Sequence, residues 1–417
     1  MNTSKHWTIF IDNSVDSHRF ITKVLEGNYP KEIAYLKDLE GKVLSRVFIE
    51  GFIRQEEVHD LKITTKDTYQ SLKSMSSGEQ QKNVLNFLLS SNPEYLVLDH
   101  PFDNLDTDSR KKLKSRLENI SLHTIIILLI SRKNDHLNFI KNQAFLSPDG
   151  KFKIVDQTSN LEKGIKKQLF LQKIPKTIST SEYKNDLLIA LKNVSVSFQN
   201  NPILKNINWS ISKGEFWQLK GVNGSGKTTL LSMITGENSK GYGQELFLFG
   251  HKKGSGETIW DIKKNIGYYA PMLTHNFKGQ HTTENMLISG LNDSIGLYQM
   301  PSTQQKQLAS KWLKVLDLKA HKDTLFSDLT IGNQRIVMVA RAMIKQPLLL
   351  ILDEPTENLD DQSAALFVQL IHKIANETST SIIYVSHREE KGLEPSFIYE
   401  LTKTNNGAVG MVFKNNN

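Results

Sequence analysis

One series of motifs occurs twice in this 417-residue chain, and the second copy is the complete one. Residues 221–228 read Gly-Val-Asn-Gly-Ser-Gly-Lys-Thr, after an apolar run at 215–220 and before the apolar stretch at 230–234. A glycine-rich loop between a strand and a helix lets backbone N–H groups and the positive end of the helix converge on a phosphate. This loop therefore predicts an α/β fold with a phosphate-binding site in the second half.

The first half carries a degraded version of the same series. Matched on Trp7 and Trp217, residues 11–18 read Ile-Asp-Asn-Ser-Val-Asp-Ser-His, so that Ser17 replaces Lys227 and the glycines are absent. The offset between the copies is 210 at this loop, but it is 254 at three later pairs: Gly78 and Gly332, Asp99 and Asp353, Asp106 and Asp360. The first copy therefore lacks 44 residues after its loop, and it also lacks a counterpart of residues 187–205. This pattern indicates a tandem duplication with a trimmed first copy.

The sequence predicts two α/β domains of tandem P-loop type. We expect a degenerate domain at 1–165, a basic and polar linker at 166–185, and an intact domain at 186–417. Apolar runs without alternation are typical of buried parallel strands. They lie at 7–11, 95–98, 125–130, 215–220, 348–352 and 382–385.

Composition narrows the possible chemistry. The chain has no cysteine, which excludes disulfides and thiolate sites. Its longest apolar run, near residues 124–130, is far shorter than the roughly 20 residues of a membrane helix. We therefore expect a cytoplasmic protein that acts, at most, peripherally at the inner face of a membrane. The net charge of +8 includes seven lysines between 151 and 176, read as a solvated linker or, alternatively, as a contact with nucleic acid or anionic lipid.

The motifs of the second copy predict a site for ATP and Mg²⁺. Backbone groups of the loop would cradle the phosphates, while Lys227 reaches the β- and γ-phosphates and Thr228 supplies a hydroxyl to Mg²⁺. Asp353 would hold Mg²⁺, Glu354 would polarise the attacking water, and His387 would position the γ-phosphate. The predicted nucleotide-binding residues of the loop are Gly221, Asn223, Gly224, Ser225, Gly226, Lys227, Thr228 and Thr229.

Together these motifs resemble those of the ABC-type ATPases. The phosphate loop is followed by Leu-Thr-Ile-Gly-Asn-Gln-Arg at 329–335, Leu-Asp-Glu-Pro at 352–355, Asn-Leu-Asp at 358–360 and Ser-His at 386–387. The resemblance covers residues 187–400 and implies ATP hydrolysis. Two further blocks, 254–262 and 294–299, are similar to those of ModF/PhrA-type tandem ABC ATPases, which are associated with molybdate transport or labelled photorepair.

The family resemblance gives the degraded copy a role. ABC ATPases bind ATP between two domains, so the loop at Lys227 would face Ser76, Ser77 and Gly78 of the first copy, with Asp106 in the crossing loop. The first copy has lost the groups of its own site, which have become Ser17, His100 and Arg132, and Asp99 is left as a helix cap or a surface acid. In the simpler alternative, Ser76 only caps a helix together with Glu79.

Two features leave alternatives open. Transporter ATPases place a glutamine after the strand at 266–268, whereas this chain reads Tyr-Ala-Pro at 269–271, which puts coupling to a membrane permease in doubt. His275, Asn276 or Gln280 could substitute for that glutamine. Phe198 is expected to stack on adenine, or else to be a core aromatic.

Three functions compete. The favoured one is a tandem ATPase that hydrolyses ATP at one composite site, is ModF-like, and is linked to ABC transport through a permease subunit. The second is a soluble ABC ATPase of repair or translation type that acts on nucleic acid. The third is an ATP-gated switch with little turnover.

Overall fold

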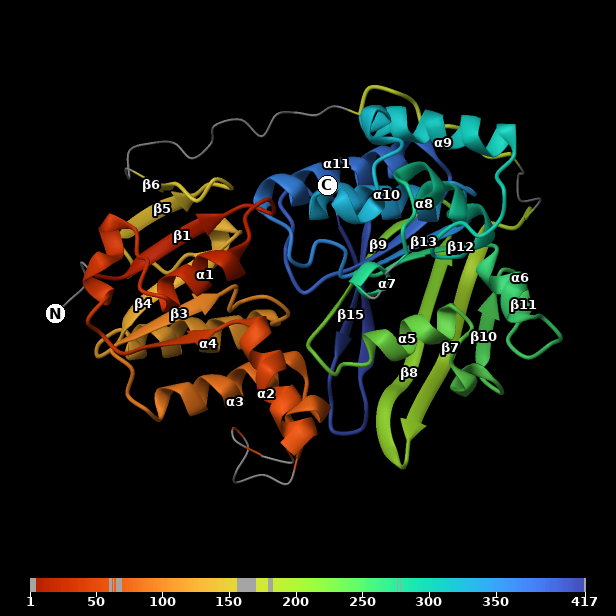
Figure 1. Cartoon of the computed structure of the whole chain (residues 1–417). Coiled ribbons are helices and arrows are strands. Elements are labelled where there is room, and N and C mark those ends of the chain that lie inside the picture. Colours follow the sequence, from red (N-terminus) through yellow and green to blue (C-terminus); the bar gives the residue numbers. More distant parts are fainter. Residues whose placement is uncertain are drawn as a thin grey trace. The chain divides into compact units, whose positions relative to one another are not determined.

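The computed structural model describes residues 5–59, 62, 64, 70–155, 170–178, 183–275, 277 and 279–415. They form two compact units: residues 1–164 with 358–362, and residues 165–357 with 363–417 (Figure 1). The second unit thus includes residues 170–178 and 183–185, the described part of the stretch for which a linker was predicted. The predicted domain limits at 165 and 186 stay a prediction.

The first unit is built on one six-stranded sheet with the order β2-β3-β4-β1-β5-β6. Its first five strands are parallel, and β6 pairs antiparallel with β5. The elements in chain order are β1 (Trp7–Ile11), α1 (Ser17–Leu25), β2 (Gly41–Leu44), α2 (Arg46–His59), α3 (Ser77–Leu89), β3 (Tyr95–Asp99), α4 (Thr107–Ile120), β4 (Ile125–Ile130), β5 (Asn142–Leu146) and β6 (Phe152–Ile154).

Both faces of this sheet are covered, which explains why its strands read as continuous apolar runs. In β4, Ile125, Ile127 and Leu129 pack with α1 on one face. The alternate residues, Ile126, Leu128 and Ile130, pack with α3 and α4 on the other. Because successive side chains of a strand point to opposite faces, a strand buried on both faces needs apolar residues throughout.

The second unit repeats the same sheet and confirms the predicted tandem fold. Its order is β12-β13-β14-β9-β15-β16, and each strand occupies the place of its counterpart in the first unit. The elements are β9 (Phe216–Gly221), α5 (Lys227–Ile234), α6 (Ile259–Lys263), β12 (Ile266–Tyr269), α7 (Met272–His275), α8 (Thr283–Ser289), α9 (Thr303–Val315), α10 (Ile331–Met343), β13 (Leu349–Asp353), α11 (Asp361–Glu377), β14 (Ser381–Val385), β15 (Phe397–Thr402) and β16 (Val409–Lys414).

The second unit also contains an antiparallel sheet with the order β11-β10-β7-β8. Its strands are β7 (Leu187–Phe198), β8 (Asn201–Ser212), β10 (Glu245–Leu248) and β11 (His251–Lys252). Among the described residues the first unit has no equivalent sheet, which agrees with the missing counterpart of 187–205. The extra sheet packs on the parallel one through a shared core in which Trp209 stacks on Tyr399 at 4.4 Å between ring centroids.

Part of the stretch predicted as a linker is docked on the second unit. Ile174 is buried, and its backbone N–H donates to the Glu377 carboxylate over 2.8 Å. The carbonyl of Pro175 accepts a hydrogen bond from the Gln346 side chain over 3.0 Å. Ile174 and Pro175 are therefore packed against the second unit, whereas Leu171 and Ile178 in the same stretch are exposed.

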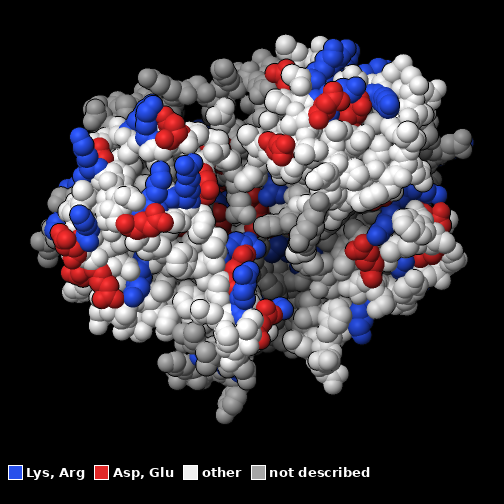
Figure 2. All heavy atoms as spheres, viewed as in Figure 1, with Lys and Arg blue, Asp and Glu red and all other residues white. Residues whose placement is uncertain are grey.

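The structure has no described helix that is both long enough and apolar enough to cross a membrane. The basic stretch at 151–176 is described only in part, because Lys163, Lys166 and Lys167 lie outside the described residues. Lysines of the described part lie next to acids both in this stretch and elsewhere, as in the ion pairs Lys151–Asp149 and Lys264–Asp261. Figure 2 shows basic and acidic side chains interspersed on the visible face. On this face, they do not gather into the basic stripe expected of a nucleic-acid interface.

Candidate nucleotide site

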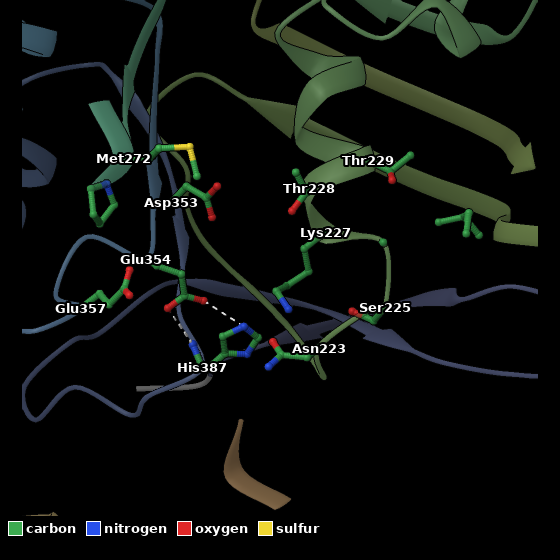
Figure 3. A pocket seen from close by; sticks show the side chains of 15 residues that line it. Asn223, Ser225, Lys227, Thr228, Thr229, Met272, Asp353, Glu354, Glu357 and His387 are labelled. Carbon is green, nitrogen blue, oxygen red and sulfur yellow. Dashed lines mark hydrogen bonds and ion pairs between the residues drawn. The ribbon is translucent and has the colours of Figure 1, made fainter. Parts of the chain in front are cut away.

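A pocket of about 440 Å³ lies in the second unit where the strands of its parallel sheet end. The order β13-β14-β9 places the carboxyl ends of three neighbouring strands side by side, and ligands of open α/β sheets bind at such ends. Loops from all three strands meet there (Figure 3). The lining residues are Ile203, Asn223, Gly224, Ser225, Gly226, Lys227, Thr228, Thr229, Ala270, Pro271, Met272, Asp353, Glu354, Glu357 and His387.

The glycine-rich loop forms one wall of the pocket. Gly226 precedes α5 with a φ of 90°, in the left-handed region that favours glycine, and a Cβ there would lie 2.7 Å from Leu204 Cδ2. This turn lets α5 begin at Lys227 with its N-terminus at the pocket. The Lys227 ammonium is buried and donates to the carbonyls of Gly221 over 2.8 Å and Val222 over 3.2 Å.

The opposite wall carries two adjacent carboxylates at the end of β13. Burial raises the pKa of Asp353, although a hydrogen bond from Tyr268 and the charge of Lys227 act in the opposite direction. The Tyr268 hydroxyl donates to Asp353 Oδ2 over 3.3 Å. Burial, and then the charges of Asp353 and Glu357, raise the pKa of Glu354 to about 8, against the lowering effects of the His387 N–H and of Lys227.

Glu354 and His387 lie next to one another in the pocket, at the ends of the neighbouring strands β13 and β14 (Figure 3). The backbone N–H of His387 donates to Glu354 Oε2 over 3.2 Å, and His387 Nε2 lies 3.3 Å from Glu354 Oε1. That second approach does not have hydrogen-bond geometry, so Oε1 is a buried oxygen without a partner among the described residues. Glu354 also has a φ of 48°, an uncommon conformation for a residue with a side chain, and such strain concentrates at functional sites.

The donor set of the pocket fits Mg²⁺ and a polyphosphate. The Thr228 hydroxyl and the Asp353 carboxylate lie on opposite walls and are oxygen ligands of the kind Mg²⁺ prefers. Ser225 is buried, and its Oγ has no hydrogen-bond partner in the described part of the chain. An orphaned hydroxyl beside a buried ammonium fits a phosphate oxygen, because buried polar groups are normally paired. The described residues contain no cluster of three or more metal-binding side chains, so phosphate oxygens or water would supply the remaining ligands.

Three sequence predictions concern the glutamine position, its possible substitutes and the adenine-stacking residue. Pro271 and Met272 line it where transporter ATPases carry the glutamine. Gln280 is exposed and is not among the lining residues, Asn276 lies outside the described residues, and the side chain of His275 is not described. Phe198 lies at the end of β7, 42% exposed and outside the pocket lining, with the Lys240 ammonium 5.8 Å from its ring centroid. It is thus not a core aromatic, and its contact with adenine stays a prediction.

In the first unit, the residues predicted to complete the site lie at two helix starts. Ser77 and Gly78 begin α3, and both the backbone N–H and the hydroxyl of Ser76 donate to the Glu79 carboxylate. The capping box of the simpler alternative is therefore present. Asp106 caps α4 by accepting a hydrogen bond from the Ser109 backbone over 2.8 Å. Ser76 and Ser77 are exposed.

At the degraded site of the first unit, Ser17, Asp99 and His100 form hydrogen bonds with one another. Asp99 was predicted as a helix cap or a surface acid, and that was wrong. Its side chain is 13% exposed, accepts a hydrogen bond from Ser17 over 3.1 Å, and pairs with His100 Nδ1 at 2.8 Å. Burial lowers the pKa of His100, but the hydrogen bond to Asp99 and the charges of Asp103, Asp99 and Asp135 together raise it above its ordinary value.

Residues 358–362 cluster with the first unit although they lie far from it in sequence. Within this cluster the backbone N–H of Asn13 donates to the Asp360 carboxylate over 2.9 Å, and its side-chain amide donates to the carbonyl of Asn358 over 2.8 Å. The loop at Asn13 thus holds a carboxylate of the protein itself.

Comparison with known proteins agrees with this geometry. The family model described as "ABC transporter" matches residues 204–357. The chain is 37% identical over 339 residues to the ABC transporter ATP-binding protein ModF of Escherichia coli (strain K12), covering 76% of this chain and 67% of ModF. It is 31% identical to the uncharacterized ABC transporter ATP-binding protein C323.04 of Schizosaccharomyces pombe, covering 77% and 66% of the two chains. The chain therefore spans about two thirds of the length of these relatives.

A solved structure described as a model of ribosome-bound archaeal Pelota and ABCE1 aligns with 98% of this chain and 75% of its own. The TM-score is 0.66 at 14% identity, a likeness of fold alone. Fold and site thus define a tandem P-loop nucleotide-binding protein. The chain belongs to the ABC-type ATPase family, as a ModF-like ABC ATP-binding protein with tandem ABC domains.

Proposed function

We propose that the second unit binds ATP with Mg²⁺ in this pocket and hydrolyses the γ-phosphate. Lys227, Ser225 and the backbone of the loop would hold the phosphates, and Thr228 and Asp353 would hold Mg²⁺, which withdraws charge from the phosphate oxygens. Glu354 would accept the proton of the attacking water, and His387 would orient the carboxylate through its backbone N–H and lie beside the γ-phosphate.

The observation that carries this proposal is the state of Glu354. Its side chain is half-buried across the pocket from Lys227, one of its oxygens makes no hydrogen bond among the described residues, and its pKa is raised to about 8. A base is most effective when its pKa lies near the working pH, and an unpaired buried oxygen offers an acceptor to a water molecule. A carboxylate that only supported the fold would be expected to have both oxygens satisfied.

We further propose that the first unit completes this site. Ser76, Ser77 and Gly78 form an exposed helix start that can offer N–H groups and a hydroxyl to a γ-phosphate. The support is the selective loss of motifs: the first unit has lost Lys, Glu and His at its own site, yet it retains this helix start and Asp106. Thr330 and Ile331, which would serve the degraded site, have diverged from the serine and glycine typical of the family.

Glu354→Gln is the direct test of turnover. The amide keeps the size of the side chain but cannot accept a proton, so we expect ATP binding to persist while phosphate release falls about 10²–10⁴-fold. In the wild-type protein, kcat/KM should rise about tenfold per pH unit below pH 8 and level off above it, because the base must be ionised. Full turnover by Glu354→Gln would contradict the proposed base.

The link to transport rests on the likeness to ModF and is proposed with it. ABC ATP-binding proteins often pair with membrane permeases, and this chain would then co-purify with one from detergent-solubilised membranes. Isolation of the tagged protein with no membrane subunit, together with ATPase activity that needs no partner, would contradict the link. At the pocket, Pro271 stands where transporter ATPases carry the glutamine that contacts the permease, so any coupling to a permease would use other residues.

A further inference from the structure

A buried arginine connects two walls of the nucleotide pocket to the start of α10. Arg335 lies just after the first turn of this helix and is 7% exposed. One terminal nitrogen donates to the hydroxyl of Tyr269, and the other donates to the carbonyl of Glu357 over 3.3 Å. Its guanidinium carbon also lies 5.8 Å from the centroid of the Tyr269 ring.

Both partners of Arg335 adjoin the pocket lining. Tyr269 is fully buried at the end of β12 and immediately precedes Ala270, Pro271 and Met272, which line the pocket. Glu357 lines the pocket itself, three residues after Glu354. A ligand that displaces either wall would therefore displace a segment, at Tyr269 or at Glu357, that is hydrogen-bonded to the Arg335 guanidinium.

The start of α10 is stiff, so that it can transmit a displacement. Thr330 caps the helix by accepting from the Asn333 backbone, and the Gln334 side chain donates to the carbonyls of Ser327 and Leu329. Ile331, the first residue of the helix, is 39% exposed. A movement of Arg335 would therefore shift an exposed helix end rather than be absorbed locally.

We propose that Tyr269 and Arg335 are positioning residues that couple the contents of the pocket to the exposed start of α10. They would take over the connection that the glutamine provides in transporter ATPases, at a place where this chain has Pro271. A proline has no side-chain donor or acceptor, so a connection at this wall must come from neighbouring residues. The inference rests on the proposed nucleotide site, because ATP is the ligand that would move the two walls.

Tyr269→Phe tests the connection by removing one oxygen. The change leaves a buried N–H of Arg335 unpaired beside its Nε, which has no partner in the described residues of the wild-type protein. We expect kcat to fall about tenfold while the KM for ATP changes less than about twofold, as for a residue that couples sites without touching the ligand. Hydrogen exchange should show that ATP protects residues 331–335 in the wild type but not in this variant.

A double variant and a control substitution of a second buried arginine distinguish a loss of coupling from a loss of stability. Tyr269→Phe combined with Arg335→Met should lose no more activity than Arg335→Met alone, because the arginine change already removes the hydrogen bond to Tyr269 together with the bond to the Glu357 carbonyl. Arg341 is a matched control: it lies on the same helix, is 5% exposed, and donates to Ser289 and the Ser294 carbonyl, away from the pocket lining. Arg341→Met should lower stability yet keep the response of residues 331–335 to ATP.

The outcomes distinguish this inference from the proposed function. If the wild-type protein neither binds nor hydrolyses ATP, the proposed function fails. If the wild type turns over ATP and Tyr269→Phe retains both normal kcat and ATP-dependent protection of residues 331–335, the coupling role is wrong while the site stands. Additive losses in the double variant would also overturn it.

Discussion

In the two units, the residues that follow the equivalent strands β3 and β13 have the same backbone conformation but different side-chain chemistry. His100 follows β3 with a φ of 49°, and Glu354 follows β13 with a φ of 48°. At the second position, a carboxylate with a raised pKa faces a lysine across an open pocket. At the first position, an imidazole pairs with Asp99, which in turn accepts a hydrogen bond from Ser17.

The difference shows what a strand-end site needs in order to bind a ligand. In the second unit, buried polar atoms such as Ser225 Oγ and Glu354 Oε1 remain unpaired among the described residues. In the first unit, both oxygens of Asp99 have a partner from the protein itself. Since buried polar groups seek partners, the open oxygen of Glu354 favours a ligand, whereas the paired carboxylate of Asp99 does not.

The largest difference in ATP turnover is expected between substitutions of Lys227 and of its counterpart Ser17. Lys227→Ala removes the only side-chain ammonium among the described residues that line the pocket, so we expect ATP turnover to fall about 10²–10³-fold. Isothermal titration should show ATP binding weakened in parallel. Ser17→Ala, the matched change in the first unit, should leave both quantities within about twofold of the wild type. Loss of ATP binding in Ser17→Ala would break the contrast between the units.

The next effect compares the two helix starts. Ser77 and Ile331 are the first residues of α3 and α10, and aspartate is well tolerated there because a helix N-terminus favours negative charge. Ser77→Asp would repel the γ-phosphate, and we expect turnover to fall about 10²-fold. Ile331→Asp should change turnover less than about threefold. Steady-state phosphate release measures both.

Ile331 is a better control than the neighbouring glycine. A Cβ at Gly332 would lie 2.6 Å from Ser363 Oγ, so any substitution there would disturb packing as well as function. At Gly78, a Cβ would approach Leu105 Cδ2 at 3.1 Å. If Ile331→Asp stops turnover and Ser77→Asp does not, the composite site proposed with the first unit is wrong.

A smaller effect concerns the stability of the second unit. Native Glu354 holds its proton up to about pH 8, while the unfolded chain releases it near 4.5, so its ionisation lowers stability as pH rises from 4.5 to 8. Glu354→Gln removes this cost and should raise the free energy of unfolding by up to about 4 kcal/mol at pH 8. At pH 4.5 the two proteins should be equal. Urea unfolding at both pH values measures the difference, and an equal difference at both would show that ionisation is not its cause.

The smallest effect concerns the pair in the first unit. The native pKa of His100 is raised, so the stability from His100 and Asp99 is fully present below pH 6.5 and is lost as pH rises through the native pKa. His100→Asn keeps a residue that tolerates positive φ and removes the charge. We expect a loss of about 1 kcal/mol at pH 6 and a smaller loss at pH 8.5, measured by hydrogen exchange at β4. A loss independent of pH would contradict the ion pair.

Much of the fold could be predicted because buried parallel strands have a simple sequence pattern. The strands predicted at 7–11 and 125–130 have those limits in the structure, and the run at 348–352 differs by one residue at each end. The walls that carry Lys227, Asp353 and Glu354 could be predicted as well, because each motif follows a strand whose carboxyl end lies at one edge of the sheet.

Side-chain partners across the sheet could not be predicted. Tyr268 to Asp353, Arg335 to Tyr269 and Ser17 to Asp99 each join elements that are 66 to 85 residues apart. Sequence spacing fixes the strand on which a residue lies, but the contact depends on rotamers and on which strands are neighbours. Only Tyr268 and Tyr269 had a signal, since they stand beside and within the stretch where the glutamine is expected.

The backbone conformation before α5 differs from that before α1, so one substitution would not restore a phosphate-binding loop in the first unit. Gly226 precedes α5 with a φ of 90°, whereas Asp16 precedes α1 with a φ of −80° and caps it through the Arg19 N–H. A point mutation from Ser17 to lysine would restore a charge, but it would not restore the turn that aims a helix at a phosphate. The turn at His100, by contrast, still matches that of Glu354. One amino-acid substitution, His100→Glu, would thus place a carboxylate on a suitable turn, whereas restoring the loop would require several substitutions.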